Sequence, residues 1–276
     1  DEQRDAARIL AAERTAWSIG IILGPAIAAA IVSLTDRVAP VFVAAALTQL
    51  VAIAVAIGSQ MPAHPPAAGR GSPASGAPAS AHADLRIWSP VMAMLLAGLV
   101  LVVLPSQTRT MFLPLFVTRV LGEPPGTVGV LFTLNAFVAV MTMPHVGSLA
   151  ERFGAHRVLY ASAGVGAAYC LLQGFATSYA QSLLIQMLIG FGIALWSTSS
   201  LIFLQQLLPG RAGTAGGIYI AVQQFTPVVS GLILGPVAEY AGIPWAFTTT
   251  AGLSLLALIV LLVAVRALGV GGHASG

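Results

Sequence analysis

Eight apolar stretches, each long enough to form a membrane-spanning helix, fill most of this 276-residue chain. A helix needs about 20 apolar residues to cross the ~30 Å hydrocarbon core of a bilayer. In lipid only helices and closed barrels satisfy their own backbone, and these stretches lack the alternating pattern of barrel strands. The sequence therefore predicts an all-α membrane protein with the lipid bilayer as its surroundings.

The predicted spans follow one another with short connections, apart from one long interruption near position 70. They cover about 14–34, 38–58, 88–109, 127–149, 157–176, 180–205, 214–236 and 244–267. The third span can extend to about residue 118, because Pro105 and Pro114 would kink a helix without necessarily ending it.

The composition excludes several classes of protein. Hydrophobic residues make up 57% of the chain and charged residues only 8%, against roughly 25% charged in an ordinary soluble domain. The net charge of +3 is small and dispersed, so no nucleic-acid partner is expected. The single cysteine, Cys170, excludes an intrachain disulfide and a thiolate metal site. We expect no cofactor and no metal.

The chain divides at a low-complexity segment rich in Pro, Ala, Gly and Ser. Residues 59–87 are predicted to be a flexible cytoplasmic linker. Two spans precede it within 1–58, six follow within 88–268, and 269–276 are expected to be a disordered tail. The chain starts with a charged stretch that does not resemble a signal peptide, so we expect it to be a piece of a longer protein.

The arginines predict the orientation. Short loops rich in Arg stay in the cytoplasm. Only Arg37 and Arg119 lie on one side of the predicted membrane, whereas the other side carries Arg4, Arg8, Arg14, Arg70, Arg86, Arg152, Arg157, Arg211 and Arg266. Both ends of the chain are therefore predicted to be cytoplasmic. The use of Arg without any Lys suggests a GC-rich bacterial genome, and hence a multi-pass protein of the bacterial cytoplasmic membrane.

Several segments carry a family resemblance. Residues 147–157 (GSLAERFGAHR), predicted to be the loop between the fourth and fifth spans, have the Gly, carboxylate, Arg, Gly and basic residue of a short cytoplasmic signature. Two further segments carry the same family resemblance: residues 203–215 (FLQQLLPGRAGTA), with Tyr219 beyond, and Leu-Pro-Leu-Phe at 113–116. On these segments the chain resembles the major facilitator superfamily, and within it the bacterial sugar efflux transporters.

The resemblance covers essentially the whole chain as family helices five to twelve. It implies two six-helix halves around a central cavity that exchange inward-open and outward-open states. Residues 1–58 would then be the last two helices of a truncated N-terminal half, and 88–268 a complete C-terminal half. Eight helices alone cannot enclose such a cavity, so the implied activity is that of the intact protein.

The signature residues Gly147, Glu151, Arg152, Gly154 and Arg157 are candidates for gating. A carboxylate near the positive end of a helix dipole is stabilised by about 0.3–1 kcal/mol. By the pseudo-symmetry of the implied fold, Glu151 should face the start of the first span near Arg14 and latch the outward-open state. The alternative is that the charged residues merely anchor the turn at the lipid headgroups.

The first span carries a second gating candidate. Gly20, Gly24 and Pro25 place small residues at a spacing that suits tight helix contact. Similar Gly-Pro elements in efflux members bend the fifth helix and seal the gap between the halves. Simple helix packing is the alternative.

Polar side chains inside the spans are the candidates for substrate contact. Amides hydrogen-bond sugar hydroxyls, and an aromatic ring packs beneath the apolar face of a sugar. The predicted binding residues are Arg109, Asn135, Gln186, Trp196, Tyr219, Gln223 and Gln224, and Gln173, Ser197 and Thr198 are further polar residues of the spans. Each uncharged residue could instead form a helix-to-helix hydrogen bond or lie at the membrane interface.

Arg109 differs from the others because a charge that deep in a membrane costs about 2.5–3.5 kcal/mol on insertion scales. It is expected either to face a wet cavity or to extend to the extracytoplasmic surface. No carboxylate lies mid-membrane. Proton coupling, if it exists, would therefore need an acid outside this chain, or a role for His145, which is more readily explained as structural.

These observations predict a secondary active transporter that exports a sugar or a similar small polar solute. The alternative is a multidrug or other metabolite exporter of the same superfamily, and uptake remains open. An enzyme is not expected, because Ser197, Ser199 and Ser200 lack the Gly-x-Ser-x-Gly setting of a hydrolase.

Overall fold

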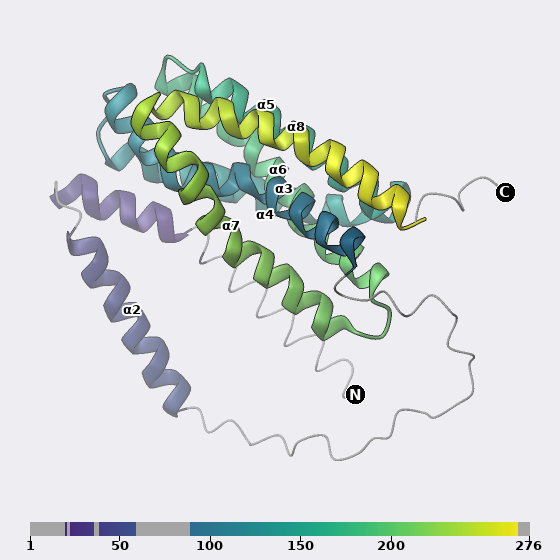
Figure 1. Cartoon of the computed structure of the whole chain (residues 1–276). Coiled ribbons are helices and arrows are strands. Elements are labelled where there is room, and N and C mark those ends of the chain that lie inside the picture. The colour runs from purple at the N-terminus through teal and green to yellow at the C-terminus, as the bar shows by residue number, and fades with distance from the viewer. Residues whose placement is uncertain (1–19, 21–22, 36–38, 59–88, 270–276) are drawn as a thin grey trace.

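A computed structural model describes residues 20, 23–35, 39–58 and 89–269, and within these ranges every regular element is a helix (Figure 1). A helix at Leu23–Thr35 is followed by α2 (Ala39–Gly58). The remaining helices are α3 (Pro90–Leu115) with the π-helical turn η1 (Phe116–Val120), α4 (Gly126–Phe153), α5 (Ala155–Gly174), α6 (Tyr179–Leu207), α7 (Ala212–Tyr240) and α8 (Ile243–Ala267). The predicted all-α class is confirmed.

Five of these helices are long and apolar enough to cross a membrane: Pro90–Val120, Gly126–Phe153, Tyr179–Leu207, Gly213–Tyr240 and Ile243–Ala267. α5 is not one of them, because small and polar residues lower its mean hydropathy. Apolar but shorter are Leu23–Thr35 and Ala39–Ala52. The span predicted at 14–34 lies partly outside the described residues. The linker predicted at 59–87 lies wholly outside them, as does the predicted tail apart from residue 269.

The predicted extension of the third span is confirmed, and it ends in a π-helical turn. Pro105 and Pro114 lie inside α3 without ending it. Pro114 has no N–H and so cannot continue the regular hydrogen-bond ladder. Beyond it the Leu121 N–H donates to the Phe116 carbonyl at 3.1 Å, and the Thr118 hydroxyl donates to the Pro114 carbonyl at 2.8 Å. The helix thus continues past Pro114 as far as Val120.

The signature segment 147–157, read from the sequence as a loop, is almost entirely helical. α4 continues through Phe153 and α5 begins at Ala155, so Gly154 alone separates them. Gly154 has φ = 89°, a conformation that residues with a side chain rarely adopt. The glycine reverses the chain in one residue and leaves Glu151 and Arg152 on the last turn of α4.

Helices α3 to α8 form one lobe in which glycines permit close approach. α3 packs against α8, α4 against α6, and α5 against both α6 and α8. A Cβ at Gly190 of α6 would lie 2.7 Å from the Asn135 carbonyl oxygen of α4. A Cβ at Gly166 of α5 would lie 2.8 Å from the Pro105 ring of α3. Such small residues are the usual means of close helix packing in membranes.

The lobe has two hydrophobic cores, one toward each end. One core joins the start of α3 to the ends of α4, α6 and α8, around Met92, Phe203 and Leu261. The other joins the end of α3 to the start of α8, where Phe247 meets Phe116 and Tyr169 edge to face at 5.6 and 6.4 Å between ring centroids. Most arginines of the lobe are close in sequence to residues of the first core: Arg152, Arg157, Arg211 and Arg266. Arg119 instead comes just after residues of the second core.

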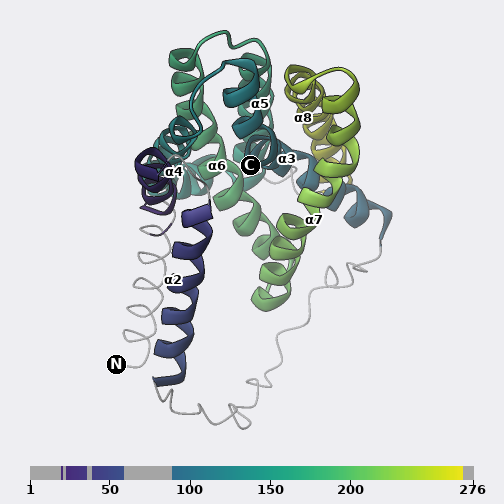
Figure 2. The same ribbon diagram turned by 90° about the vertical axis from the view of Figure 1, so that its left-hand side faces the viewer.

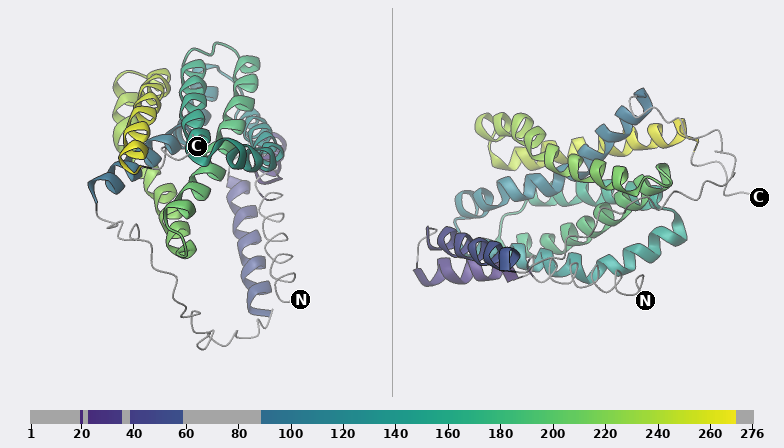
Figure 3. Two further views of the ribbon diagram at one scale, coloured as in Figure 1. Left: turned by 90° about the vertical axis from the view of Figure 1, so that its right-hand side faces the viewer. Right: turned by 90° about the horizontal axis from the view of Figure 1, so that it is seen from below.

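The two N-terminal helices stand differently toward this lobe. The Leu23–Thr35 helix lies alongside the first half of α4, whereas α2 projects away from the lobe (Figures 2 and 3). α2 exposes large apolar side chains, with Phe42 71% and Leu50 62% exposed. Of the five long helices, α4 and α7 are the least covered by neighbouring helices. Only 22% of an apolar 18-residue stretch of each is buried, against 56% in α3 and in α6. Among the described long helices, α4 and α7 therefore have the largest uncovered faces.

The Gly190 contact predicts the effect of adding a single methyl group. Gly190→Ala should destabilise the protein by about 1–3 kcal/mol, because the α4 backbone cannot move aside as a flexible side chain can. In Gly252→Ala the methyl meets nothing within 4 Å, so this control should be neutral or stabilising by up to about 1 kcal/mol. Thermal unfolding of the purified protein in detergent measures both variants. Equal midpoints would show that the contact between α4 and α6 is not tight.

Candidate functional site

Arg109 of α3 is buried in the lobe, with 8% of its surface exposed. Its guanidinium carbon lies 4.4 Å from the centre of the Phe132 ring on α4. Among the described residues, neither Nε nor Nη1 has a hydrogen-bond partner, and both atoms are sealed from solvent. In this structure the Arg109 side chain is therefore enclosed by the described residues of the lobe, and it neither faces a solvent-filled cavity nor extends to the surface of the lobe.

A row of neutral polar side chains lies next to Arg109, supplied by α4, α5 and α6. The Gln173 amide donates to the Ser182 hydroxyl at 2.9 Å, and the Gln186 amide donates to Gln173 Oε1 at 3.4 Å. The Asn135 amide donates to the Gln186 main-chain carbonyl at 3.5 Å. Gln173, Ser182 and Gln186 are fully buried. This row is therefore first of all a set of helix-to-helix hydrogen bonds.

Two atoms of this neighbourhood remain available for hydrogen bonding. Gln186 Oε1 and the Tyr169 hydroxyl are buried without a hydrogen-bond partner of good geometry in the described part of the chain. Tyr169 is close enough to Arg109 to interact with it electrostatically, and its hydroxyl lies within hydrogen-bonding reach of the Gln186 side chain. Tyr169 and Phe132 were not predicted as site residues. Tyr169 could have been found from the sequence, because it is a polar side chain inside an apolar run. Nothing in the sequence distinguishes Phe132 from the other apolar residues of its span.

The predicted aromatic residues form a second group, on α6 and α7. The Trp196 and Tyr219 rings lie 6.1 Å apart between centroids, with 35° between their planes. The Trp196 indole N–H is buried and unpartnered among the described residues. Gln223 follows Tyr219 by one helical turn and is half-buried, whereas Gln224 is exposed on another face of α7. The structure thus brings Trp196, Tyr219 and Gln223 together and leaves Gln224 apart.

The two groups are separated along the lobe. Gln186 and Trp196 are ten residues apart on α6, which corresponds to a rise of about 15 Å. The seven predicted binding residues therefore do not form a single cluster. Arg109, Asn135 and Gln186 belong to the core that contains Phe247, and Trp196 and Tyr219 belong to the core that contains Phe203.

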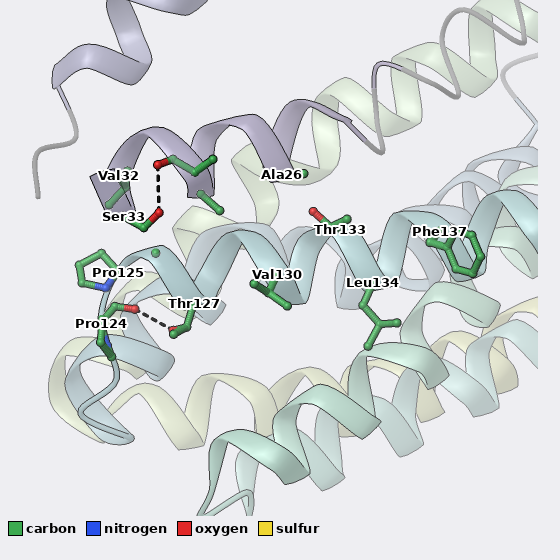
Figure 4. A pocket seen from close by; sticks show the side chains of 13 residues that line it. Ala26, Val32, Ser33, Pro124, Pro125, Thr127, Val130, Thr133, Leu134 and Phe137 are labelled. Atoms are coloured by element: carbon green, nitrogen blue, oxygen red, sulfur yellow. Dashed lines mark hydrogen bonds between the residues drawn. The ribbon is translucent and has the colours of Figure 1, made fainter. Parts of the chain in front are cut away.

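A pocket of about 890 Å³ lies between the Leu23–Thr35 helix and the first half of α4 (Figure 4), and none of the predicted binding residues lines it. Its lining is mainly apolar, with Ala26, Ala29, Val130 and Leu134 among the residues that form it. Its hydroxyls on Ser33, Thr127 and Thr133 all donate to carbonyls of their own segments at 2.7–2.9 Å. The pocket therefore suits an apolar occupant better than a sugar.

The gating candidates of the first span have different surroundings. A Cβ at Gly20 or Gly24 would meet nothing within 4 Å, so neither makes a tight helix contact with the described residues. Contact begins at Pro25, whose carbonyl oxygen would lie 2.7 Å from a Cβ at Gly129 of α4; that Cβ would also collide with the Ala29 side chain. Gly129 was missed because its partner is a different helix.

The signature residues lie at the end of the lobe that carries most of its arginines. Glu151, Arg152 and Arg157 are exposed, and Glu151 forms no ion pair within the described residues. The Arg152 guanidinium lies 5.3 Å from the centre of the Phe153 ring. Gly147 is half-buried, with nothing within 4 Å of an added Cβ. Arg14 lies outside the described residues, so the latch between Glu151 and Arg14 remains a prediction.

The carboxylates of the described residues all lie at helix ends or in loops. They are Glu123 between η1 and α4, Glu151 near the end of α4 and Glu239 near the end of α7. His145 is exposed, with Nδ1 3.3 Å from the Met141 carbonyl oxygen. No group of three His, Cys, Asp or Glu side chains that could hold a metal occurs in the part of the chain that the structure describes.

These helices define a multi-pass membrane protein, and the chain belongs to the Major Facilitator Superfamily, whose sequence model matches residues 95–272. Members of this superfamily are transporters rather than enzymes.

Three relatives are similar over parts of the chain. Sugar efflux transporter B of Salmonella typhimurium is 30% identical over 46% of this chain, and sugar efflux transporter A of Escherichia coli is 24% identical over 54%. The uncharacterized MFS-type transporter YybF of Bacillus subtilis is 24% identical over 52%. The matches span only 32–38% of the length of these relatives.

The buried row of amides predicts that two of the candidate glutamines, Gln186 and Gln224, contribute differently to stability. Gln186→Ala should cost about 1–3 kcal/mol of stability, because it leaves Gln173 Oε1 buried without its donor. Gln224→Ala removes an exposed amide and should change stability by no more than about 0.5 kcal/mol. Chemical or thermal unfolding in detergent compares them. Equal losses would contradict the structural role assigned to Gln186.

Proposed function

We propose that this chain is part of a secondary active transporter that exports a sugar or a similar small polar solute by alternating access. The observation that carries the proposal is the Trp196–Tyr219 pair, with its unpartnered indole N–H and with Gln223 one turn away. An aromatic surface beside neutral hydrogen-bonding groups matches a sugar, which has an apolar face and a rim of hydroxyls. Two of the similar proteins are sugar efflux transporters, which supports the same class of cargo.

The exposure of the helices supports a position at a central cavity. α7, which carries Tyr219 and Gln223, is one of the two least covered long helices of the lobe. Tyr219 and Gln223 are half-buried, and the exposed face of α7 beside them adjoins the cavity between the two halves of a full transporter. We assign the protein to the bacterial cytoplasmic membrane with both ends of this chain in the cytoplasm, as the arginine distribution favours.

Proton coupling would require a group beyond the described helices. Glu123, Glu151 and Glu239 lie at helix ends or in loops, where an acid cannot deliver a proton to mid-membrane. A carboxylate on another part of the full-length protein would then titrate during transport.

The pocket at the Leu23–Thr35 helix favours a second candidate function, export of lipophilic compounds. Its hydroxyls are already bonded to the backbone, which leaves an apolar surface. A lipophilic cation or drug fits such a surface better than a sugar does.

Ligand-induced stabilisation distinguishes the two candidates. The protein expressed from its complete coding sequence should unfold at a higher temperature with saccharides present, and lipophilic cations should have no such effect. Trp196→Phe should weaken the saccharide response, since it removes the indole N–H, whereas Trp245→Phe, at a side chain 59% exposed, should preserve it. Stabilisation by lipophilic cations alone would replace the first candidate with the second.

A disulfide tests alternating access directly. A Cβ at Gly126 would lie 3.7 Å from the Ser33 Cβ, within the ~3.5–4.5 Å that a disulfide requires. The double variant Ser33→Cys with Gly126→Cys should cross-link under oxidation and stop transport, because the two helices can no longer separate at this end. Reduction should restore it. The natural Cys170 is fully buried and should not interfere.

The matched control carries Ser33→Cys alone and should transport normally under the same oxidant. Full transport by the cross-linked double variant would show that this contact does not open during the cycle.

A further inference from the structure

We propose that Arg109 binds an oxyanion, so that the exported solute carries a carboxylate or a phosphate group in addition to its hydroxyls. This rests on the proposed function and narrows its substrate class. Because Gln186, beside Arg109, lies about 15 Å along α6 from Trp196, a solute the size of a sugar contacts the two groups in succession rather than together. The sequence predicted Arg109 as a residue for substrate contact without assigning the chemistry of the group that it binds. The structure adds its burial, its unfilled donors and the identity of its neighbours.

The unfilled donors point to an in-plane partner. Phe132 covers a face of the guanidinium, at 4.4 Å from its carbon to the ring centre. A ring over the face leaves the N–H groups in the plane free. Nε and Nη1 lie on different edges of the guanidinium, so each edge offers a donor without a partner. A guanidinium presents its N–H groups as a planar fork of charged donors, and each of these two N–H groups can donate a charge-assisted hydrogen bond to a carboxylate or phosphate oxygen.

The described part of the lobe supplies no charge to balance Arg109. Its three carboxylates, Glu123, Glu151 and Glu239, lie at helix ends or in loops, and none pairs with this arginine. A buried charge without a partner is strongly unfavourable, and intramembrane charges commonly mark substrate pathways. An anion that enters with the solute would balance the charge during part of the transport cycle.

The neighbouring atoms favour a hydroxylated anion over a simple inorganic one. The Tyr169 hydroxyl can donate to the anion, and Gln186 Oε1 can accept from a solute hydroxyl. Both are buried without a partner of good geometry among the described residues. A charged donor beside a neutral donor and a neutral acceptor is the set that a sugar acid or a sugar phosphate would use.

The test compares ligands that differ only in the anionic group. The protein from the complete coding sequence is purified in detergent, and binding of glucose, glucuronate and glucose 6-phosphate is measured by titration calorimetry. At least one of the two anions should bind about tenfold or more tightly than glucose, as one charge-assisted hydrogen bond permits. The two arms separate recognition of a carboxylate from recognition of a phosphate.

Variants then assign any preference to Arg109. Arg109→Gln should bring the anion and glucose to similar affinities, and Arg109→Lys should retain part of the preference, because it keeps the charge but not the fork. Arg119→Gln is the control, since Arg119 is exposed and lies outside this group, and it should keep the preference. If Arg109→Gln does not fold, the test rests on the ratio of anion to glucose affinity in the wild-type protein and in Arg109→Lys.

Each outcome has a distinct meaning. Glucose binding as tightly as both anions overturns the inference and leaves the proposed function intact, with an acid of the full-length protein as the partner of Arg109. An anion preference that survives in Arg109→Gln also overturns it. Binding of none of the three ligands, together with stabilisation by lipophilic cations, would overturn the proposed function itself.

Discussion

The contact between Gly190 and the α4 backbone is the constraint from which the arrangement of the polar lobe interior follows. Only a residue without a side chain lets α6 approach the Asn135 carbonyl this closely. That approach brings the Asn135 amide within 3.5 Å of the Gln186 carbonyl on α6, and the Gln186 side chain in turn donates to Gln173 of α5. Buried amides in a membrane must find partners in other helices. The spacing of two backbones therefore decides whether these amides are satisfied.

The same lobe contains polar groups of two kinds. The Gln173, Ser182 and Gln186 side chains bond mainly to one another and hold helices together. Arg109, Tyr169 and Trp196 keep buried N–H or O–H groups without partners among the described residues. Buried unpartnered groups are rare in folded proteins, because each retains its desolvation cost. They are where binding of a solute would release the most free energy.

The sequence predicted the helices well and their ends less well. Runs of apolar residues gave the spans, and even the extension past Pro105 and Pro114 was confirmed. The signature segment was misread as a loop, because its charged residues look like a connection, although one glycine with positive φ suffices for the turn. Charge alone does not end a helix at the membrane surface, where water and headgroups solvate the side chains.

Among the candidate site residues, the sequence by itself determined which side chains are polar and how deep they lie, since both follow from composition and from the fixed rise of a helix. Only the tertiary structure decided their partners. It placed Phe132 over Arg109, paired Trp196 with Tyr219, set Gln224 apart and brought Gly129 against Pro25. The physical reason is that the rotation of each helix about its axis depends on side-chain packing against its neighbours, which no single span encodes.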